Sequence, residues 1–434
     1  MSRPLLLEGG HVVDPSTTRD GSADVLVVDG RIEAVESDLV GPDDADRLSV
    51  EGLVVAPGLI DVHVHLREPG GEHKETIRTG AQAAAAGGFT TVWAMPNTDP
   101  PLDDPAAVGF VRQEARRWAR RGEGGARVSP VGAASKGLAG EQMTEIGGLV
   151  DAGAVAVTDD GRPISDPALM RRLLEYTQTF GIPVLQHAED MRLTAGGVMN
   201  EGSVATELGL RGIPSASEAA VVARDVLLAE LTGGHLHIQH LSTCESVDLV
   251  AAARARGARV TTELTPHHLV LTETAVRDYR TEAKMNPPLR TEIDRTALRT
   301  ALIDGVIDMI ATDHAPHHYE EKEREFDDAP FGVVGLETAF AICHQDLVVS
   351  GDMTLPALVD RMSCIPARTM GIDGGTLRPG SPADIVVLDP DARWTIDPER
   401  FLSKSRNTPF AGFEVTGRVK RTIVAGETRY EDSA

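Results

Sequence analysis

The sequence predicts an α/β protein: a (β/α)8 TIM barrel with a small β-sandwich domain formed by both chain ends. Two patterns support this fold. Through the middle of the chain, eight short apolar, β-rich runs alternate with stretches of helical spacing, whereas both ends carry short alternating strands. The 434 residues also leave room for a barrel of about 250 residues with appended strands.

The two chain ends read as strands of one small domain. Segments such as Asp24–Gly30 and Ala383–Asp389 alternate apolar and polar residues and are punctuated by Gly, Pro and Asp. This alternation predicts strands with one buried face. We therefore expect residues 1–54 and 373–434 to form the β-sandwich domain, and residues 55–372 to form the barrel.

The barrel strands are predicted from eight regularly spaced runs. Between them lie segments with helical spacing, such as Glu75–Ala86 and Pro214–Leu231. In a barrel of this type the chemistry lies at the C-terminal ends of the strands, so the last residues of each run are candidate site residues. The runs are 58–66, 89–97, 127–135, 153–160, 182–190, 235–243, 259–268 and 306–316.

Composition excludes several function classes. The chain has 66 acidic and 42 basic residues and a formal charge of -24, which argues against nucleic acid or an anionic membrane as partner. Its three cysteines form no CxxC pair, which favours a reducing cytoplasm. Neither a signal-peptide core nor an apolar run long enough to span a bilayer is present. We expect a cytoplasmic protein.

Two histidines end the first barrel run. Side chains at i and i+2 of a strand point to the same face, so His63 and His65 can hold one cation together. A single His-x-His pair is also consistent with an ordinary half-buried strand. Further candidate ligands at other strand ends favour a metal site.

Imidazoles and carboxylates end four more runs. The four imidazoles and two carboxylates that would meet at one mouth suit zinc, and so many ligands suit two ions rather than one. Three other histidines are expected to pack or to orient the ligands: His237, which has the opposite strand parity from His240, and the pair His267 and His268. The six candidate ligands are His63, His65, Asp160, His187, His240 and Asp313.

Short motifs with a characteristic order accompany these residues. They are His65–Gly70, Met95–Thr98, Thr158–Gly161, Thr265–His268, Met285–Arg290, Ile310–His317, Ala329–Gly332 and Asn407–Phe410. With them the chain resembles, over almost its whole length, the cyclic amidohydrolases of the amidohydrolase superfamily and, within these, the bacterial-type, class I dihydroorotases.

The resemblance implies a centre of two Zn²⁺ ions per subunit. His63 and His65 would hold the first ion, and His187 and His240 the second. Asp160 and a hydroxide would bridge the two ions. Asp313 would bind the first ion and act as the catalytic general acid/base.

Two other residues compete with Asp160 for the bridging position. Asp159 precedes it in the Thr158–Gly161 motif, and Asp160 is preferred because the family motif places the ligand second. Many relatives use a carboxylated lysine instead, and Lys136 is the one nearby candidate, although it follows a different strand.

Substrate specificity is expected from side chains beyond the metals. Arg67 follows His65 by two residues and can make a bidentate contact to a substrate carboxylate. For Asn97, Asn286 and His317 a substrate-binding role is preferred, and the alternative is that they shape a turn, a bend or a solvated loop. The substrate-binding residues that the resemblance implies are His65, Arg67, Asn97, Asn286, His317, Phe331 and Gly332.

The implied activity is the reversible cyclisation of N-carbamoyl-L-aspartate to L-dihydroorotate in pyrimidine (UMP) biosynthesis. One alternative is another cyclic amidohydrolase, an allantoinase or a hydantoinase/dihydropyrimidinase. A second alternative is an inactive dihydroorotase-like partner of aspartate transcarbamoylase. A homodimer and an association with that transcarbamoylase are the expected assemblies.

Overall fold

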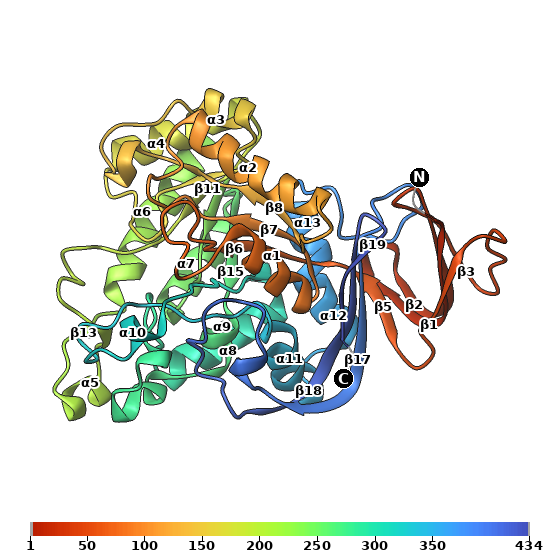
Figure 1. The fold of residues 1–434 in the computed structure, drawn as a ribbon. Coiled ribbons are helices and arrows are strands. Elements are labelled where there is room, and N and C mark those ends of the chain that lie inside the picture. The colour runs from red at the N-terminus through yellow and green to blue at the C-terminus, as the bar shows by residue number, and fades with distance from the viewer. Residues whose placement is uncertain (1–2, 433–434) are drawn as a thin grey trace.

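The central body of the protein is a closed parallel barrel (Figure 1). It is seen in a computed structural model that describes residues 3–432. The strands are β6 (Leu59–Val64), β7 (Phe89–Ala94), β8 (Arg127–Pro130) with its continuation β9 (Gly132–Ala133), β10 (Val157–Thr158), β11 (Val184–Gln186), β14 (Leu236–Ile238), β15 (Val260–Leu264) and β16 (Met309–Ile310). Neighbouring strands pair in sequence order, and a parallel bridge between Val64 and His314 closes the ring.

Each barrel strand lies within one of the predicted runs, so the predicted fold class is confirmed. The apolar residues of the runs form the interior: Leu59, Phe89, Val157 and Val184 are fully buried. A parallel barrel covered by helices buries both faces of its strands, which explains why the runs are continuously apolar rather than alternating.

Helices follow the strands and cover the barrel. Thr76 begins α1 with a capping box in which its side chain and that of Thr79 each accept a backbone N–H. The helices are α1 (Ile77–Ala86), α2 (Pro105–Arg120), α3 (Ile146–Ala152), α4 (Pro167–Tyr176), α5 (Ser203–Leu208), α6 (Ala216–Thr232), α7 (Cys244–Ala255), α8 (Pro266–Val270), α9 (Glu292–Asp304), α10 (Tyr319–Lys322), α11 (Ala339–Cys343), α12 (Leu355–Val359) and α13 (Ile365–Met370). No helix of residues 3–432 is both long and apolar enough to cross a membrane.

Both chain ends contribute to one eight-stranded sheet in the order β19-β18-β17-β5-β1-β2-β3, with β4 paired to β1. Figure 1 shows β1, β2 and β3 extending away from the barrel, with β17 and β18 closer to it. The strands are β1 (Leu5–Asp14), β2 (Arg19–Val28), β3 (Arg31–Glu36), β4 (Asp46–Ser49), β5 (Val54–Pro57), β17 (Ile385–Thr395), β18 (Glu414–Val424) and β19 (Glu427–Glu431). β5 therefore crosses the predicted boundary at residues 54 and 55.

Strand β17 faces two hydrophobic cores. Ile385 and Val387 pack into the core of the end sheet, whereas Val386 and Leu388 pack into the barrel core. The alternation follows directly from the two-residue period of a strand. The end sheet is thus fixed to the barrel through alternate residues of one continuous strand.

A small insertion lies beyond the barrel mouth, with β12 (Met199–Asn200) paired to β13 (Gly212–Ile213). The buried Arg290 guanidinium ties this insertion to the barrel by donating to Asn200 Oδ1 at 2.9 Å and to the Ile213 carbonyl at 2.8 Å. The loops after β15 and β16 lie at the barrel mouth, where they supply Met285, Asn286, Ala315, His317, Pro330 and Phe331.

Candidate metal centre and active site

The six side chains selected as candidate metal ligands converge at the C-terminal mouth of the barrel. In three overlapping groups, the potential ligand atoms all lie within 4.8 Å of one another. These groups are His63, His65 and Asp160; His63, His240 and Asp313; and Asp160, His187 and His240. The residues come from five different strand ends, which meet there because the strands are parallel and the barrel is closed.

Asp160 lies at the centre of this cluster. Its Oδ1 is 3.5 Å from His63 Nε2 and 3.8 Å from both His187 Nδ1 and His240 Nε2. Its Oδ2 is 3.3 Å from His65 Nε2. Oδ1 is buried and has no hydrogen-bond partner among the described residues. Leaving a buried carboxylate oxygen unpaired is costly, so the position of this atom fits a cation ligand.

Asp159 and Lys136 point elsewhere. Asp159 Oδ1 accepts the Ser135 N–H at 2.8 Å, and its other oxygen accepts the Ser135 hydroxyl, so this carboxylate is satisfied on the neighbouring strand. Lys136 is exposed at the start of a short turn. The geometry favours Asp160 over both alternatives for the bridging position.

Three of the histidines are held by an acceptor on the side away from Asp160. His63 Nδ1 lies 2.5 Å from Glu263 Oε1, and His65 Nδ1 lies 2.8 Å from Asn97 Oδ1. Likewise, His187 Nε2 lies 3.0 Å from Glu189 Oε2. Metal-bound histidines characteristically donate their second ring N–H in this way, which orients the ring and selects its tautomer. The donor set, its burial and these outer contacts fit a metal centre.

Glu263 was not selected from the sequence. It is the penultimate residue of β15 and is fully buried. Its Oε2 lies 3.0 Å from His237 Nε2, and its Oε1 accepts the His240 N–H at 3.2 Å. The neighbouring imidazoles of His63 and His237 offset the effect of burial and lower the pKa of this carboxyl. A charged residue inside an apolar strand run was the signal that could have identified it. His237 meets the expectation of a supporting role.

Three residues of the site have a strained backbone. Arg67, His240 and Asp313 adopt φ values of +60°, +32° and +46°, a region that non-glycine residues seldom occupy. Each of these residues follows the end of a barrel strand. Such strain is typical of functional sites, where the surrounding structure compensates for its cost.

Asp313 directs its carboxylate at the first histidine pair. Its Oδ1 lies 3.0 Å from His65 Nε2 and 3.4 Å from His63 Nε2. Burial by itself would raise the pKa of Asp313, but the imidazoles of His63, His65 and His240 outweigh burial and lower it to about 2. Asp313 is therefore held as a carboxylate, the form that accepts a proton.

A cavity of about 310 Å³ opens over the cluster. Besides the metal-ligand candidates it is lined by Arg67, Asn97, Gly161, Met285, Asn286, Ala315, His317, Pro330 and Phe331. Gly161 has φ +85°, and a Cβ there would lie 2.9 Å from Asn97 Nδ2. Only glycine fits at this position, and its small size leaves the Asn97 amide beside the cavity.

Arg67 presents its terminal nitrogens to this cavity. Its Nε donates to the Pro316 carbonyl at 3.2 Å, which fixes the guanidinium plane. Within residues 3–432, its two terminal nitrogens have no hydrogen-bond partner. The paired N–H groups therefore remain available for a bidentate contact to a carboxylate.

The other predicted substrate-binding residues differ in which of their polar atoms are already hydrogen-bonded within the protein. Asn286 Nδ2 donates to Glu189 Oε2 at 3.0 Å. His317 Nε2 donates to the Phe331 carbonyl at 2.8 Å, while its Nδ1 is buried, has no hydrogen-bond partner in the described chain and lies 3.5 Å from Glu321 Oε2. Burial and the nearby Arg67 lower the pKa of His317 to about 2, so the neutral ring carries a lone pair on its unpartnered side.

Gly332 lies behind His317 and does not line the cavity. Its N–H donates to the Lys284 carbonyl at 2.9 Å, and its carbonyl accepts Asn407 Nδ2 at 3.0 Å. A Cβ at Gly332 would lie 2.6 Å from the Ala315 carbonyl oxygen. In this conformation Gly332 allows close packing beneath the site, and its polar backbone atoms are bonded to the protein.

Curated relatives match the whole chain. The chain is 52% identical over 427 residues to a dihydroorotase of Geobacter metallireducens, which covers 98% of this chain and 99% of the relative. It is 50% identical over 428 residues to a dihydroorotase of Pelotomaculum thermopropionicum, with 99% of each chain covered. A family model described as dihydro-orotase-like matches residues 52–246.

Solved structures show the same fold. An L-hydantoinase (dihydropyrimidinase) from Arthrobacter aurescens aligns with a TM-score of 0.88 at 26% identity and covers 100% of this chain and 97% of its own. A D-hydantoinase (dihydropyrimidinase) from Thermus sp. aligns with a TM-score of 0.82 at 27% identity, covering 99% and 96%. The hydantoinases share the architecture, but the sequence likeness to dihydroorotases is about twice as high and spans the full length. The chain is therefore an enzyme of the amidohydrolase superfamily and belongs to the dihydroorotase family.

Proposed function

We propose that this enzyme interconverts N-carbamoyl-L-aspartate and L-dihydroorotate at a dinuclear zinc centre, as a step of pyrimidine biosynthesis. The observation that carries the proposal is the unpaired Asp160 Oδ1 among three imidazoles, in one cavity with the free terminal nitrogens of Arg67. The first feature suits metal-assisted amide chemistry. The second suits an anionic substrate.

The metals would be held by the six strand-end residues. His63 and His65 would bind one ion, His187 and His240 the other, and Asp160 would bind both, with Asp313 on the first ion. When bound, zinc supplies a water that is acidic enough to be a nucleophile near neutral pH and polarises an amide carbonyl.

Asp313 would move the proton. In hydrolysis of dihydroorotate it accepts a proton from the attacking water and delivers it to the departing ring nitrogen. In the biosynthetic direction it takes a proton from the ureido nitrogen as the ring closes. The same residue serves both directions because forward and reverse reactions share their transition states.

Arg67 would bind the substrate carboxylate through its two terminal nitrogens, with Asn97 donating from Nδ2. His65 borders the same end of the cavity, and Asn286 would face the amide edge of the ring. His317 must rotate its ring or gain a proton to donate to a carboxylate, since its Nε2 hydrogen is directed at Phe331. Gly332 would contribute by shaping the backbone next to Phe331.

The proposal also covers the cellular compartment and the assembly of the enzyme. Three free cysteines, two of them buried, suit a reducing cytoplasm. The resemblance to class I dihydroorotases favours a homodimer and an association with aspartate transcarbamoylase. Size measurement of the purified protein, alone and mixed with that transcarbamoylase, tests both assemblies.

The decisive experiment compares substrates on protein of measured metal content. L-dihydroorotate, hydantoin, allantoin and dihydrouracil are assayed in parallel on the same preparation. We expect turnover of dihydroorotate to exceed that of the three neutral rings by orders of magnitude. Equal turnover of dihydrouracil would favour a hydantoinase-type enzyme, and absence of zinc together with absence of activity after zinc addition would favour an inactive homologue.

A further inference from the structure

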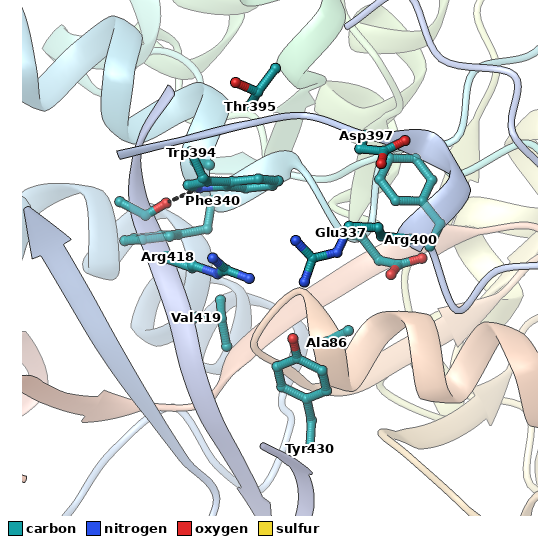
Figure 2. A pocket seen from close by; sticks show the side chains of 13 residues that line it. Ala86, Glu337, Phe340, Trp394, Thr395, Asp397, Arg400, Arg418, Val419 and Tyr430 are labelled. Atoms are coloured by element: carbon teal, nitrogen blue, oxygen red, sulfur yellow. Dashed lines mark hydrogen bonds between the residues drawn. The ribbon is translucent and has the colours of Figure 1, made fainter. Parts of the chain in front are cut away.

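A second cavity lies outside the active site, between the end sheet and the barrel helices α1 and α11. Figure 2 shows it from close by, with Phe340, Arg418 and Val419 on one side, Glu337 and Arg400 on the other, Trp394 above and Tyr430 below. Its volume is about 100 Å³, and it shares no lining residue with the cavity over the metal cluster. This volume is less than the roughly 150 Å³ of a cavity that holds benzene in a protein core, but the lining residues Thr395 and Arg400 are exposed, so a single ring would enter only in part and remain open to solvent on one side.

Two guanidinium groups converge in this cavity. Figure 2 shows Arg400 and Arg418 turned toward each other above the Tyr430 hydroxyl. Arg418 is bonded along one edge to Asp432, with Nε 2.9 Å from Oδ2. Arg400 makes no side-chain hydrogen bond or ion pair with any residue of the described chain. Two like charges that face each other repel, and an anion between them would convert this repulsion into attraction.

The Glu337 carboxylate in the cavity wall already accepts backbone hydrogen bonds. Glu337 accepts the N–H groups of Leu402 at 2.9 Å and Ser403 at 3.0 Å. Burial raises the pKa of Glu337 to about 7, so near neutral pH it supplies only part of a negative charge. Asp397 also lines the cavity, with its Oδ1 accepting the Glu399 N–H at 3.0 Å, and Asp432 pairs with Arg418, so the uncompensated positive charge at the cavity comes from Arg400.

Aromatic side chains complete the walls. Trp394 is fixed by donating its Nε1–H to the Gly417 carbonyl at 3.0 Å, and Phe340 and Phe401 lie among the lining residues. The Arg418 guanidinium stands 5.6 Å from the centre of the Trp394 ring. Six of the thirteen lining residues are polar or charged, so the cavity combines an aromatic wall with polar groups that could orient a small molecule.

From this geometry we infer that the cavity is a binding site for a small aromatic carboxylate. The ring would pack against Trp394, and the carboxylate would accept hydrogen bonds from Arg400, Arg418 and Tyr430. The arginines select the negative charge, and the aromatic wall selects a flat ring.

Benzoate is the probe that tests this inference. Isothermal titration of the intact protein should show one site with a dissociation constant of about 1 mM, the strength that a ligand of this size reaches. Cyclohexanecarboxylate keeps the charge and benzamide keeps the ring, and each should bind at least about tenfold more weakly. Equal binding of either compound would overturn the proposed chemistry.

Variants locate the bound benzoate. Arg400→Gln should weaken binding about tenfold or more, since one charged donor is lost. Arg393→Gln changes an exposed arginine of the same strand region outside the cavity and should leave binding unchanged. Tyr430→Phe removes only a hydroxyl and should weaken binding by a smaller factor.

The active site also contains an arginine, so Arg67→Met is the necessary comparison. Benzoate binding should persist in this variant. Binding that disappears with Arg67→Met and survives Arg400→Gln would show that benzoate occupies the substrate cavity, and the inference would be wrong. The absence of any binding to the unmodified protein would also overturn it, whereas failure of the proposed enzymatic function would leave this test unaffected.

Discussion

The strand ends and the loops of the active-site mouth are built in different ways. On the strand side, five strand ends place His63, Asp160, His240 and their neighbours around one point. On the loop side, buried lysines hold the chain: Lys322 Nζ donates to the carbonyl of Pro330 at 2.9 Å, and Lys284 Nζ to that of Phe326 at 2.5 Å. The barrel geometry determines the first arrangement, and individual hydrogen bonds to irregular backbone determine the second.

This comparison teaches that the two sides have separate supports. In the proposed function, the strand side would carry the metal ligands, with Glu263 behind them, and also Arg67 for the substrate. The loop side would carry the substrate contacts His317 and Phe331, with Lys322 behind them. A change to a metal ligand should therefore affect metal content and chemical rate, whereas a change to Arg67 or to the loop side should affect substrate affinity.

The largest expected effect is on the strand side. Asp313→Ala should lower kcat by about 10³-fold or more, because the proton acceptor is lost, while much of the metal remains. Steady-state kinetics and metal analysis of the same sample check this outcome. Asp327→Ala, an exposed loop residue, serves as the control. Wild-type turnover in Asp313→Ala would rule out the proton role.

Arg67 is the corresponding residue for the substrate. Arg67→Met should raise KM for dihydroorotate by about 10²-fold, because a bidentate contact to the carboxylate disappears, and should leave metal content unchanged. Arg67→Lys should recover only part of the loss, since an ammonium group lacks the planar fork. An unchanged KM in the methionine variant would refute the carboxylate assignment.

Glu263 tests the support of the metal side. Glu263→Gln should weaken metal binding by about 10- to 100-fold, since the acceptor that orients His63 loses its charge. Metal retention during dialysis against a chelator measures this, and the visible spectrum of the cobalt-substituted protein should change as well. Glu273→Gln removes a buried carboxylate that is bonded to Asn200 in the insertion, and it should leave metal binding as it is.

The smallest expected effect concerns Lys322, whose buried ammonium group holds the loop after β16 by hydrogen bonds to backbone carbonyls. Burial lowers the pKa of Lys322 to about 7, whereas in the unfolded chain the group stays protonated to well above pH 9. Between these values the unfolded state binds more protons, so the free energy of unfolding should rise with pH.

Lys322→Met should remove this dependence, which amounts to about 1–2 kcal/mol between pH 7 and pH 9. Denaturant unfolding at both pH values measures the difference. Lys136→Met, which changes an exposed lysine, is the matched control. A variant that keeps the wild-type pH dependence would contradict the explanation.

Strand parity and run order were sufficient to predict the barrel and the meeting of the candidate ligands at one mouth, whereas the choice of Asp160 over Asp159 rested on the family motif. The i, i+2 rule places His63 and His65 on one face, and parallel strands bring the remaining candidates to the same mouth. The role of Glu263 was not predicted because its partners His63 and His237 lie on other strands. A single sequence does not show which buried carboxylate contacts which imidazole.

The loop side was less predictable. That Gly332 bonds to Lys284 and Asn407, and that His317 is directed at Phe331, depends on contacts between segments far apart in the chain. Loop conformation has no periodic pattern from which such contacts follow. The pairing of the chain ends could be predicted from their alternation, but not the division of β17 between two cores.

That division has a consequence for cooperativity. A chain ending before β17 would lose Val386 and Leu388 from the barrel interior and Ile385 and Val387 from the sheet interior in one step. Neither the barrel nor the end sheet has a complete hydrophobic core without β17. Heating should therefore unfold the barrel and the sheet in a single calorimetric transition. The strands contributed by the chain ends should therefore stabilise the barrel as well as their own sheet.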